Sequence, residues 1–247
     1  MKQIVLIIST VLGIGLTDLP AHNYSEGEVL TVMATSGLRL RMSPNMESAT
    51  IHILRYGDTV VVSDTYGFGR EHADRIAWMD GHWIKVRFGN ISGYVFDSFL
   101  STLPAPTHEN QLCIDCSSVT IPFDRYLADN YTAVSVKEST HHREDLHQFV
   151  TVYHEGITAT RTAGEGWYQL EVSFDDHRLC EILNLMRSMM VDPQLRRSFE
   201  ESLIFREDHT GHVNEVEITL YPNPIKLTNE HGKTHLSSMV ITDEGGC

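Results

Sequence analysis

The chain has 247 residues, of which 41% are hydrophobic, and it carries a formal net charge of −14 at pH 7. This length suits one large domain or two ordinary ones, and the apolar content is sufficient for packed cores. Residues 103–247 contain 11 Lys and Arg against 23 Asp and Glu, a net of −12, so the acidic excess lies in the second half. Such a surface repels phosphate backbones and anionic lipids, which argues against nucleic-acid binding and electrostatic membrane adhesion.

The N-terminus has the three-part pattern of a secretory signal peptide. Lys2 provides a positive charge, residues 4–16 are almost wholly apolar, and small and turn-forming residues lead to Pro20 and Ala21. We therefore predict a signal peptide over residues 1–21 and a periplasmic or secreted protein; the alternative is a retained N-terminal anchor. The apolar run is too short to span a bilayer comfortably, and no membrane span is predicted after signal cleavage.

The next part of the chain, from about residue 29 to residue 100, predicts short β-strands separated by turn residues. Leu38 and Leu40 alternate with Arg39 and Arg41, which indicates a strand with one packed face and one wet face. Residues 103–110 predict a linker, because two prolines and several polar residues leave little to pack. We place the domain boundary there.

The second half predicts strands, then helices, then strands again. The alternation of apolar and polar residues at 167–174 indicates a half-buried strand. Asp175 or Asp176 is then expected to cap a helix whose apolar residues recur with helical spacing up to Met190. Asp192 and Pro193 suit the N-cap and first residue of a second helix, and strands follow from about Val213. This order predicts an α+β domain with two helices on an antiparallel sheet.

Four motifs within residues 36–102 occur in the order found in one family of small β-domains. They are GLRLR at 37–41, ILRYGD at 53–58, WIKVR at 83–87 and GYV at 93–95. The region resembles bacterial SH3-like domains, which implies a small SH3-like β-barrel over residues 27–102. The predicted fold class is therefore mainly β followed by α+β: this barrel, the linker at 103–110, and an acidic antiparallel-sheet domain with two helices at 111–247.

The resemblance also implies binding of peptidoglycan or an envelope protein segment through an aromatic-lined groove. By position, the candidate ligand-binding residues are Tyr66, Trp78, Trp83, Tyr94 and Phe96. The alternative is that Trp83 and one of Tyr94 or Phe96 are core residues, since strand alternation must bury some of them. The second half, at AGEGWY (163–168), resembles a region that follows SH3-like domains in proteins of the Bacteroidetes type, for which no activity is implied.

One catalytic alternative rests on Cys116. The triplet Asp115-Cys116-Ser117 is similar to the start of the catalytic helix in NlpC-type cell-wall cysteine peptidases, where a helix dipole lowers the thiol pKa, and His154 or His212 is the candidate base. Ser118 departs from the glycine of that family, and the β-branched residues and Pro122 that follow argue against a helix.

The remaining cysteines and histidines leave several options open. Cys113, Cys116, Cys180 and Cys247 allow three complete disulfide pairings, among which the sequence does not choose. The pairs His209/His212 and His231/His235 have ligand-like spacing but lie in polar turn-like stretches, so we interpret them as surface histidines and predict no metal and no cofactor. The function predicted is an exported, non-catalytic binding or adaptor protein of the cell envelope.

Overall fold

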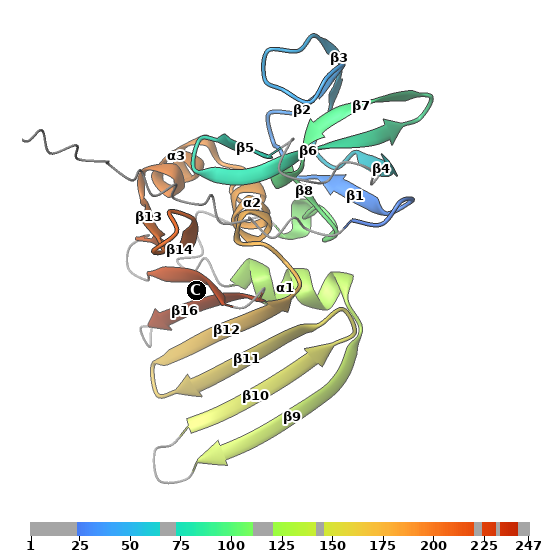
Figure 1. Ribbon diagram of the computed structural model, residues 1–247. Coiled ribbons are helices and arrows are strands. Elements are labelled where there is room, and N and C mark those ends of the chain that lie inside the picture. Colours follow the sequence, from blue (N-terminus) through green and yellow to red (C-terminus); the bar gives the residue numbers. More distant parts are fainter. Residues whose placement is uncertain are drawn as a thin grey trace, which may run out of the picture.

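The structure is a computed structural model that describes residues 24–64, 73–110, 121–141, 146–219, 224–230 and 233–241. The predicted signal peptide, Tyr66, Cys113, Cys116, Cys247 and His231 lie outside the described residues. The described chain consists of two antiparallel sheets and three α-helices, which confirms the predicted class of mainly β followed by α+β (Figure 1).

In the described residues, the N-terminal sheet has eight strands and one 3-10 turn. These are β1 (Val29–Val32), β2 (Leu38–Arg41), β3 (Thr50–Leu54), β4 (Thr59–Asp64), β5 (Ala73–Ile76), β6 (Met79–Phe88), β7 (Ile91–Phe96), η2 (Asp97–Phe99) and β8 (Leu100–Ser101). The strand order is β3-β2-β7-β6-β4-β1-β8, with β5 paired to β6. Leu30, Val60, Ile84 and Val95 are each fully buried in its core. Among the described residues the sheet runs as an open path, so the SH3-like barrel stays a prediction.

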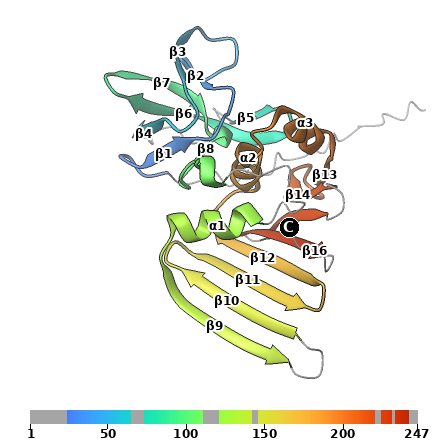
Figure 2. The ribbon, with the colours of Figure 1, turned by 180° about the vertical axis from the view of Figure 1, so that it is seen from behind.

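The C-terminal sheet also has eight strands, and helices cover one of its faces. Its elements are η3 (His108–Asn110), α1 (Ile121–Asn130), β9 (Ala133–His141), β10 (Leu146–Tyr153), β11 (Ile157–Gly164), β12 (Trp167–Asp175), α2 (Leu179–Met189), α3 (Pro193–Glu201), β13 (Leu203–Glu207), β14 (Val213–Ile218), β15 (Ile225–Glu230) and β16 (Lys233–Ile241). The strand order is β13-β14-β15-β16-β12-β11-β10-β9. Figures 1 and 2 show α1 and α2 between the two sheets, with β9 and β10 extending away from the N-terminal sheet.

The structure has three α-helices where the sequence predicted two. The additional helix, α1, begins at Ile121, so the expectation that Pro122 and its β-branched neighbours exclude a helix there was wrong. Proline is tolerated in the first turn of a helix because the N–H it lacks has no intrahelical acceptor. Phe123, Tyr126 and Leu127 then share one face and are almost completely buried against the sheet, which stabilises the helix by tertiary packing.

The segment between the two sheets is packed rather than free. Leu103 is 2% exposed and belongs to the core of the C-terminal sheet, contrary to the expectation that this segment leaves little to pack. The Tyr126 hydroxyl donates a hydrogen bond of 2.8 Å to the Pro104 carbonyl, and the Tyr56 hydroxyl donates one of 3.2 Å to the Pro106 carbonyl. The segment therefore contributes to a single packed body. Within the described parts of the chain, no helix has the length and apolar character needed to cross a bilayer.

Candidate functional site

The aromatic residues predicted to bind a ligand lie in different environments. Trp83 and Phe96 are 4% and 1% exposed and their rings are 5.7 Å apart, so both are core residues, as the alternative interpretation proposed. Trp78 lies in the turn between β5 and β6 and stacks on Phe205 of β13 with ring centroids 4.6 Å apart. Tyr94 is half-buried on β7. The structure therefore brings Trp83 and Phe96 together in the interior. It places Trp78 in the contact between the N-terminal sheet with its connections (the N-terminal unit) and the C-terminal sheet with its helices (the C-terminal unit).

That contact is built around α2, which lies between the two sheets. Ten of its 11 residues are buried, including the polar residues Glu181, Asn184 and Ser188. The sequence predicted one apolar face for this helix. The opposite, polar face is buried against the N-terminal unit, and each of its polar groups therefore needs a partner.

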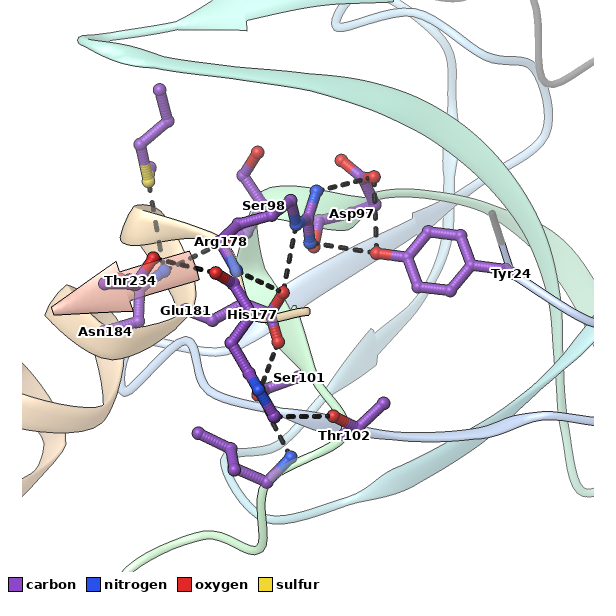
Figure 3. Close-up of polar contacts among 12 residues, drawn as sticks. Tyr24, Asp97, Ser98, Ser101, Thr102, His177, Arg178, Glu181, Asn184 and Thr234 are labelled. Atoms are coloured by element: carbon purple, nitrogen blue, oxygen red, sulfur yellow. Dashed lines mark hydrogen bonds and ion pairs between the residues drawn. The ribbon is translucent and has the colours of Figure 1, made fainter. Parts of the chain in front are cut away.

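Arg178 is the central residue of the polar contact (Figure 3). Its Nη1 donates to Asp97 Oδ2 at 2.8 Å, its Nη2 donates to the Asp97 carbonyl and to the Tyr24 hydroxyl at 2.9 Å each, and its Nε donates to Glu181 Oε1 at 3.0 Å. The side chains of Asp97 and Glu181 are only 1% and 3% exposed. One guanidinium thus joins two buried carboxylates, one from each unit.

Neighbouring groups satisfy the remaining oxygen atoms of these carboxylates. The His82 backbone N–H donates to Asp97 Oδ1 at 2.8 Å, and the Ser101 hydroxyl donates to Glu181 Oε2 at 2.8 Å. A Cβ at Gly81 would lie 2.5 Å from Asp97 Oδ1, so glycine is required for this close approach of β6. All four carboxylate oxygen atoms of Asp97 and Glu181 therefore accept hydrogen bonds from protein groups.

Other bonds extend the same contact along α2. Asn184 Nδ2 donates to the Ser98 carbonyl at 2.8 Å, His177 Nε2 lies 3.2 Å from Thr102 Oγ1, and the Thr234 hydroxyl donates to the His177 carbonyl at 2.7 Å. Figure 3 shows that these residues approach from both units and from β16. The contact is continuous from the start of α2 through its second turn.

The electrostatics of the network favour the charged forms of Arg178 and Glu181. Burial alone would lower the pKa of Arg178, but the Asp97 carboxylate opposes this and the net pKa is well above the ordinary value. Burial alone would raise the pKa of Glu181, but Arg178 and His177 outweigh it and the net pKa is lowered. Burial and then Asp97 raise the pKa of Tyr24, which keeps it a phenol able to donate. The ion pair between Arg178 and Glu181 is therefore formed at neutral pH.

The start of α2 differs from the prediction. Arg178 is the N-cap, and its backbone N–H donates to Glu181 Oε1 at 3.3 Å, so Asp175 and Asp176 do not cap the helix. Asp175 ends β12 and pairs with Lys233 at 2.8 Å, while Asp176 adopts a positive φ of 58° in the turn. The strand extends further than expected, which moves the helix start towards the C-terminus.

A second polar contact joins the β5–β6 hairpin to the β13–β14 turn. Arg75 Nη2 donates to Asp80 Oδ2 at 2.8 Å and to the Gly211 carbonyl at 2.7 Å, and His212 Nδ1 lies 3.0 Å from Asp80 Oδ2. Burial alone would raise the pKa of Asp80, but hydrogen bonds from Arg75 and His212 lower it overall. His212 is thus engaged in an interface contact.

The described residues include some of the cysteines and histidines considered as catalytic, disulfide or metal-binding groups, among them Cys180 and His154. Cys180 is 7% exposed, and burial raises the pKa of its thiol to about 11, which makes it a thiol rather than a nucleophilic thiolate at neutral pH. His154 is exposed in the β10–β11 turn. Among the residues that the structure describes, no three His, Cys, Asp or Glu side chains are grouped as metal ligands would be.

The open face of the C-terminal sheet contains a shallow hollow of about 400 Å³ across β11, β12 and β16. It lies opposite the helices, because Leu170, Val172 and Phe174 of β12 point into the helix-covered core and their neighbours point outwards. Two cross-strand rows of polar side chains line it. They are Thr158–Ser173–His235 and Thr160–Glu171–Ser237.

The chemistry of the hollow is that of a hydrogen-bonding surface. Four of the six side chains are hydroxyls, and each hydroxyl offers one donor and two acceptor lone pairs. Glu171 and His235 add a carboxylate and an imidazole to these hydroxyls. The sequence alone did not predict this site, because the alternation at 167–174 indicates which face of the strand is polar but gives no register with β16.

Comparison with known proteins gives no match to a family model, a curated protein or a solved structure. The resemblance of residues 36–102 to bacterial SH3-like domains therefore remains a prediction from the motifs.

Proposed function

We propose that the protein is an exported, non-catalytic binding or adaptor protein of the cell envelope. In this proposal the open face of the C-terminal sheet binds a neutral glycan segment of the cell wall. The N-terminal unit, as the SH3-like resemblance implies, engages a protein segment or a second wall component. The buried network around Arg178 holds the two surfaces in a fixed relation.

The observation that carries the proposal is the pair of polar rows in the hollow. A glycan presents many hydroxyl groups that both donate and accept, which matches a surface of four hydroxyls, one carboxylate and one imidazole. The hollow is shallow and open, which suits a polymer that lies across a surface rather than a small molecule enclosed in a pocket. The formal net charge of −14 disfavours polyanionic polymers, so a neutral glycan is the better match.

The test is co-sedimentation of the mature protein with peptidoglycan sacculi, with soluble fragments measured in the same tubes. We expect pelleting without fragment release. The variant Thr160→Val removes one hydroxyl from the hollow without changing the side-chain volume greatly, and we expect a Kd raised roughly 2- to 12-fold, the value of one hydrogen bond. Thr50→Val, an exposed strand threonine on the N-terminal sheet, is the matched control and should leave Kd unchanged.

Three outcomes would count against the proposal. Absence of pelleting would exclude wall binding, and equal pelleting of the triple variant Thr158→Val/Thr160→Val/Glu171→Gln would exclude the hollow as the binding surface. Release of fragments that requires reduced Cys116 would instead establish the cysteine peptidase alternative.

A further inference from the structure

The last strand of the C-terminal sheet, β9, is an exposed edge. Among the strands of the described residues it pairs only with β10, and it is nine residues long. Figures 1 and 2 show it at the far end of the sheet, beyond the cover of α1. Val134 and Val136 of β9 are 55% and 65% exposed, and Phe149 of β10 is 37% exposed. Val136 lies opposite Thr151, and Glu138 opposite Phe149, so this apolar group faces the helix side of the sheet.

An edge of this kind is a template for another strand. Its outer N–H and C=O groups are not used within the sheet, and natural proteins usually shorten, bend or charge such edges. The opposite edge, β13, has these protections: it has five residues, a register shift at Arg206/Glu207, and ion pairs of 3.0 Å from Arg206 to both Glu215 and Glu217. The pairing of β9 with β10 also has a register shift, between Val152 and Tyr153 of β10 at the N-terminal end of β9, but it is regular from Ser135 opposite Val152 to His141 opposite Leu146.

We infer that β9 pairs with β9 of a second copy of this chain, forming a two-fold symmetric dimer with a continuous sheet. The charge distribution favours this occupant. Strands β9, β10 and β11 contain Lys137, Arg161 and Glu138 as their charged residues, a net of +1 in a chain of net −14. Electrostatic repulsion between two copies at this edge is therefore weaker than the net charge of the whole chain would suggest.

The sequence of β9 selects one register for the pairing. A two-fold axis perpendicular to the sheet brings residues of the same face opposite each other. An axis at Lys137 or Glu138 would place like charges directly opposite, which is destabilising. An axis at Val136 keeps seven residues of each strand paired, with Val136 opposite itself, Val134 opposite Glu138, and Ser135 opposite Lys137. This register covers the most exposed apolar side chain of the strand and opposes no like charges.

The test is the molar mass of the full mature chain across a concentration series, measured by light scattering and sedimentation velocity. We expect a monomer–dimer equilibrium without larger species, because an isologous contact closes. Val136→Lys should raise the dimer Kd at least about tenfold, since it removes two apolar contacts and opposes two ammonium groups. Ile204→Lys, at a 45% exposed residue of the opposite edge, is the matched control and should leave Kd unchanged.

Cysteine cross-linking tests the register independently of affinity. Val136→Cys should form a disulfide-linked dimer under mild oxidation, because the two sulfur atoms face each other across the axis. Ser139→Cys should not exceed the wild-type background, because residue 139 lies opposite Ala133. A chain that is monomeric at all concentrations, a Val136→Lys variant that dimerises as the wild type does, or equal cross-linking at both positions would overturn the inference. A β9 edge that binds only an extended segment of another protein would also overturn it.

Discussion

Replacing Arg178 with methionine should destabilise the joined units strongly. Methionine keeps most of the side-chain length but removes the charge, which leaves the carboxylate of Asp97, 1% exposed, and that of Glu181, 3% exposed, without their cation. Removing one partner of a buried ion pair typically costs about 3 to 5 kcal/mol. A domain has a total stability of about 5 to 15 kcal/mol, so this one change removes a large share of it.

The assay is urea unfolding followed by tryptophan fluorescence and circular dichroism, together with calorimetry. For a chain of this size, 3 to 5 kcal/mol corresponds to a fall in Tm of about 6 to 20 °C. Trp83 reports on the N-terminal unit, Trp167 on the C-terminal sheet, and Trp78 on the contact between them. We expect one coincident transition for the wild type and separated transitions for Arg178→Met, because the network couples the two units.

Two controls separate the buried network from a general loss of charge. Arg197→Met removes a surface ion pair with Glu201, whose side chains are 79% and 65% exposed, and should cost less than about 0.5 kcal/mol. Adding Asp97→Asn to Arg178→Met removes the unpaired charge, so the double variant should be more stable than the sum of the single changes predicts. A cost below about 1 kcal/mol for Arg178→Met, with coincident transitions and no coupling to Asp97, would refute the reasoning.

Three further predictions follow from the contacts above. The pKa values of Asp80 and Glu181 are lowered in the folded protein, so the unfolded chain binds more protons than the folded one as the pH falls. The stability that these groups contribute is present above their ordinary pKa values of 3.8 and 4.5, and it should be lost as the pH falls through their lower pKa values in the folded protein. A urea midpoint independent of pH between about 6 and 3 would contradict this. Asp192→Ala removes the side chain that accepts hydrogen bonds from the backbone N–H groups at the start of α3, and it should lower the free energy of unfolding by about 1 kcal/mol. The change should appear as a lower urea midpoint with an unchanged slope, and an unaltered midpoint would argue against the cap. Cys180 should resist alkylation in the folded protein at pH 8 and react after unfolding, as peptide mass mapping would show, because its buried thiol has a pKa of about 11.

Much of the local structure was predictable because its causes are local. The alternation at residues 167–174 predicted β12, and the apolar spacing up to Met190 predicted α2. Asp192 followed by Pro193 predicted the start of α3, and Asp192 accepts from two backbone N–H groups there. Strand alternation, helical spacing and capping each depend on residues within a few positions of one another. These signals can therefore be read from one sequence without knowledge of the tertiary contacts.

The errors fall where distant packing overrides local preference. The helix α1 forms despite Pro122 because Phe123 packs edge-on against Phe174, with ring centroids 6.4 Å apart, and Tyr126 is fully buried. Trp83 and Phe96 belong to the interior because of their positions on paired strands, which the motifs alone did not determine. Local propensity is a weak preference that burial of an aromatic face readily outweighs.

The sequence by itself determined the fold class, most of the strands, and the acidic character of the second half. The tertiary structure decided the interface and the open surfaces. Arg178 reaches Asp97 across 81 positions, and Thr160, Glu171 and Ser237 form one row only because β11, β12 and β16 pair in one register. The physical reason is that docking and register arise from the summed packing of whole elements, whereas composition and periodicity describe one element at a time.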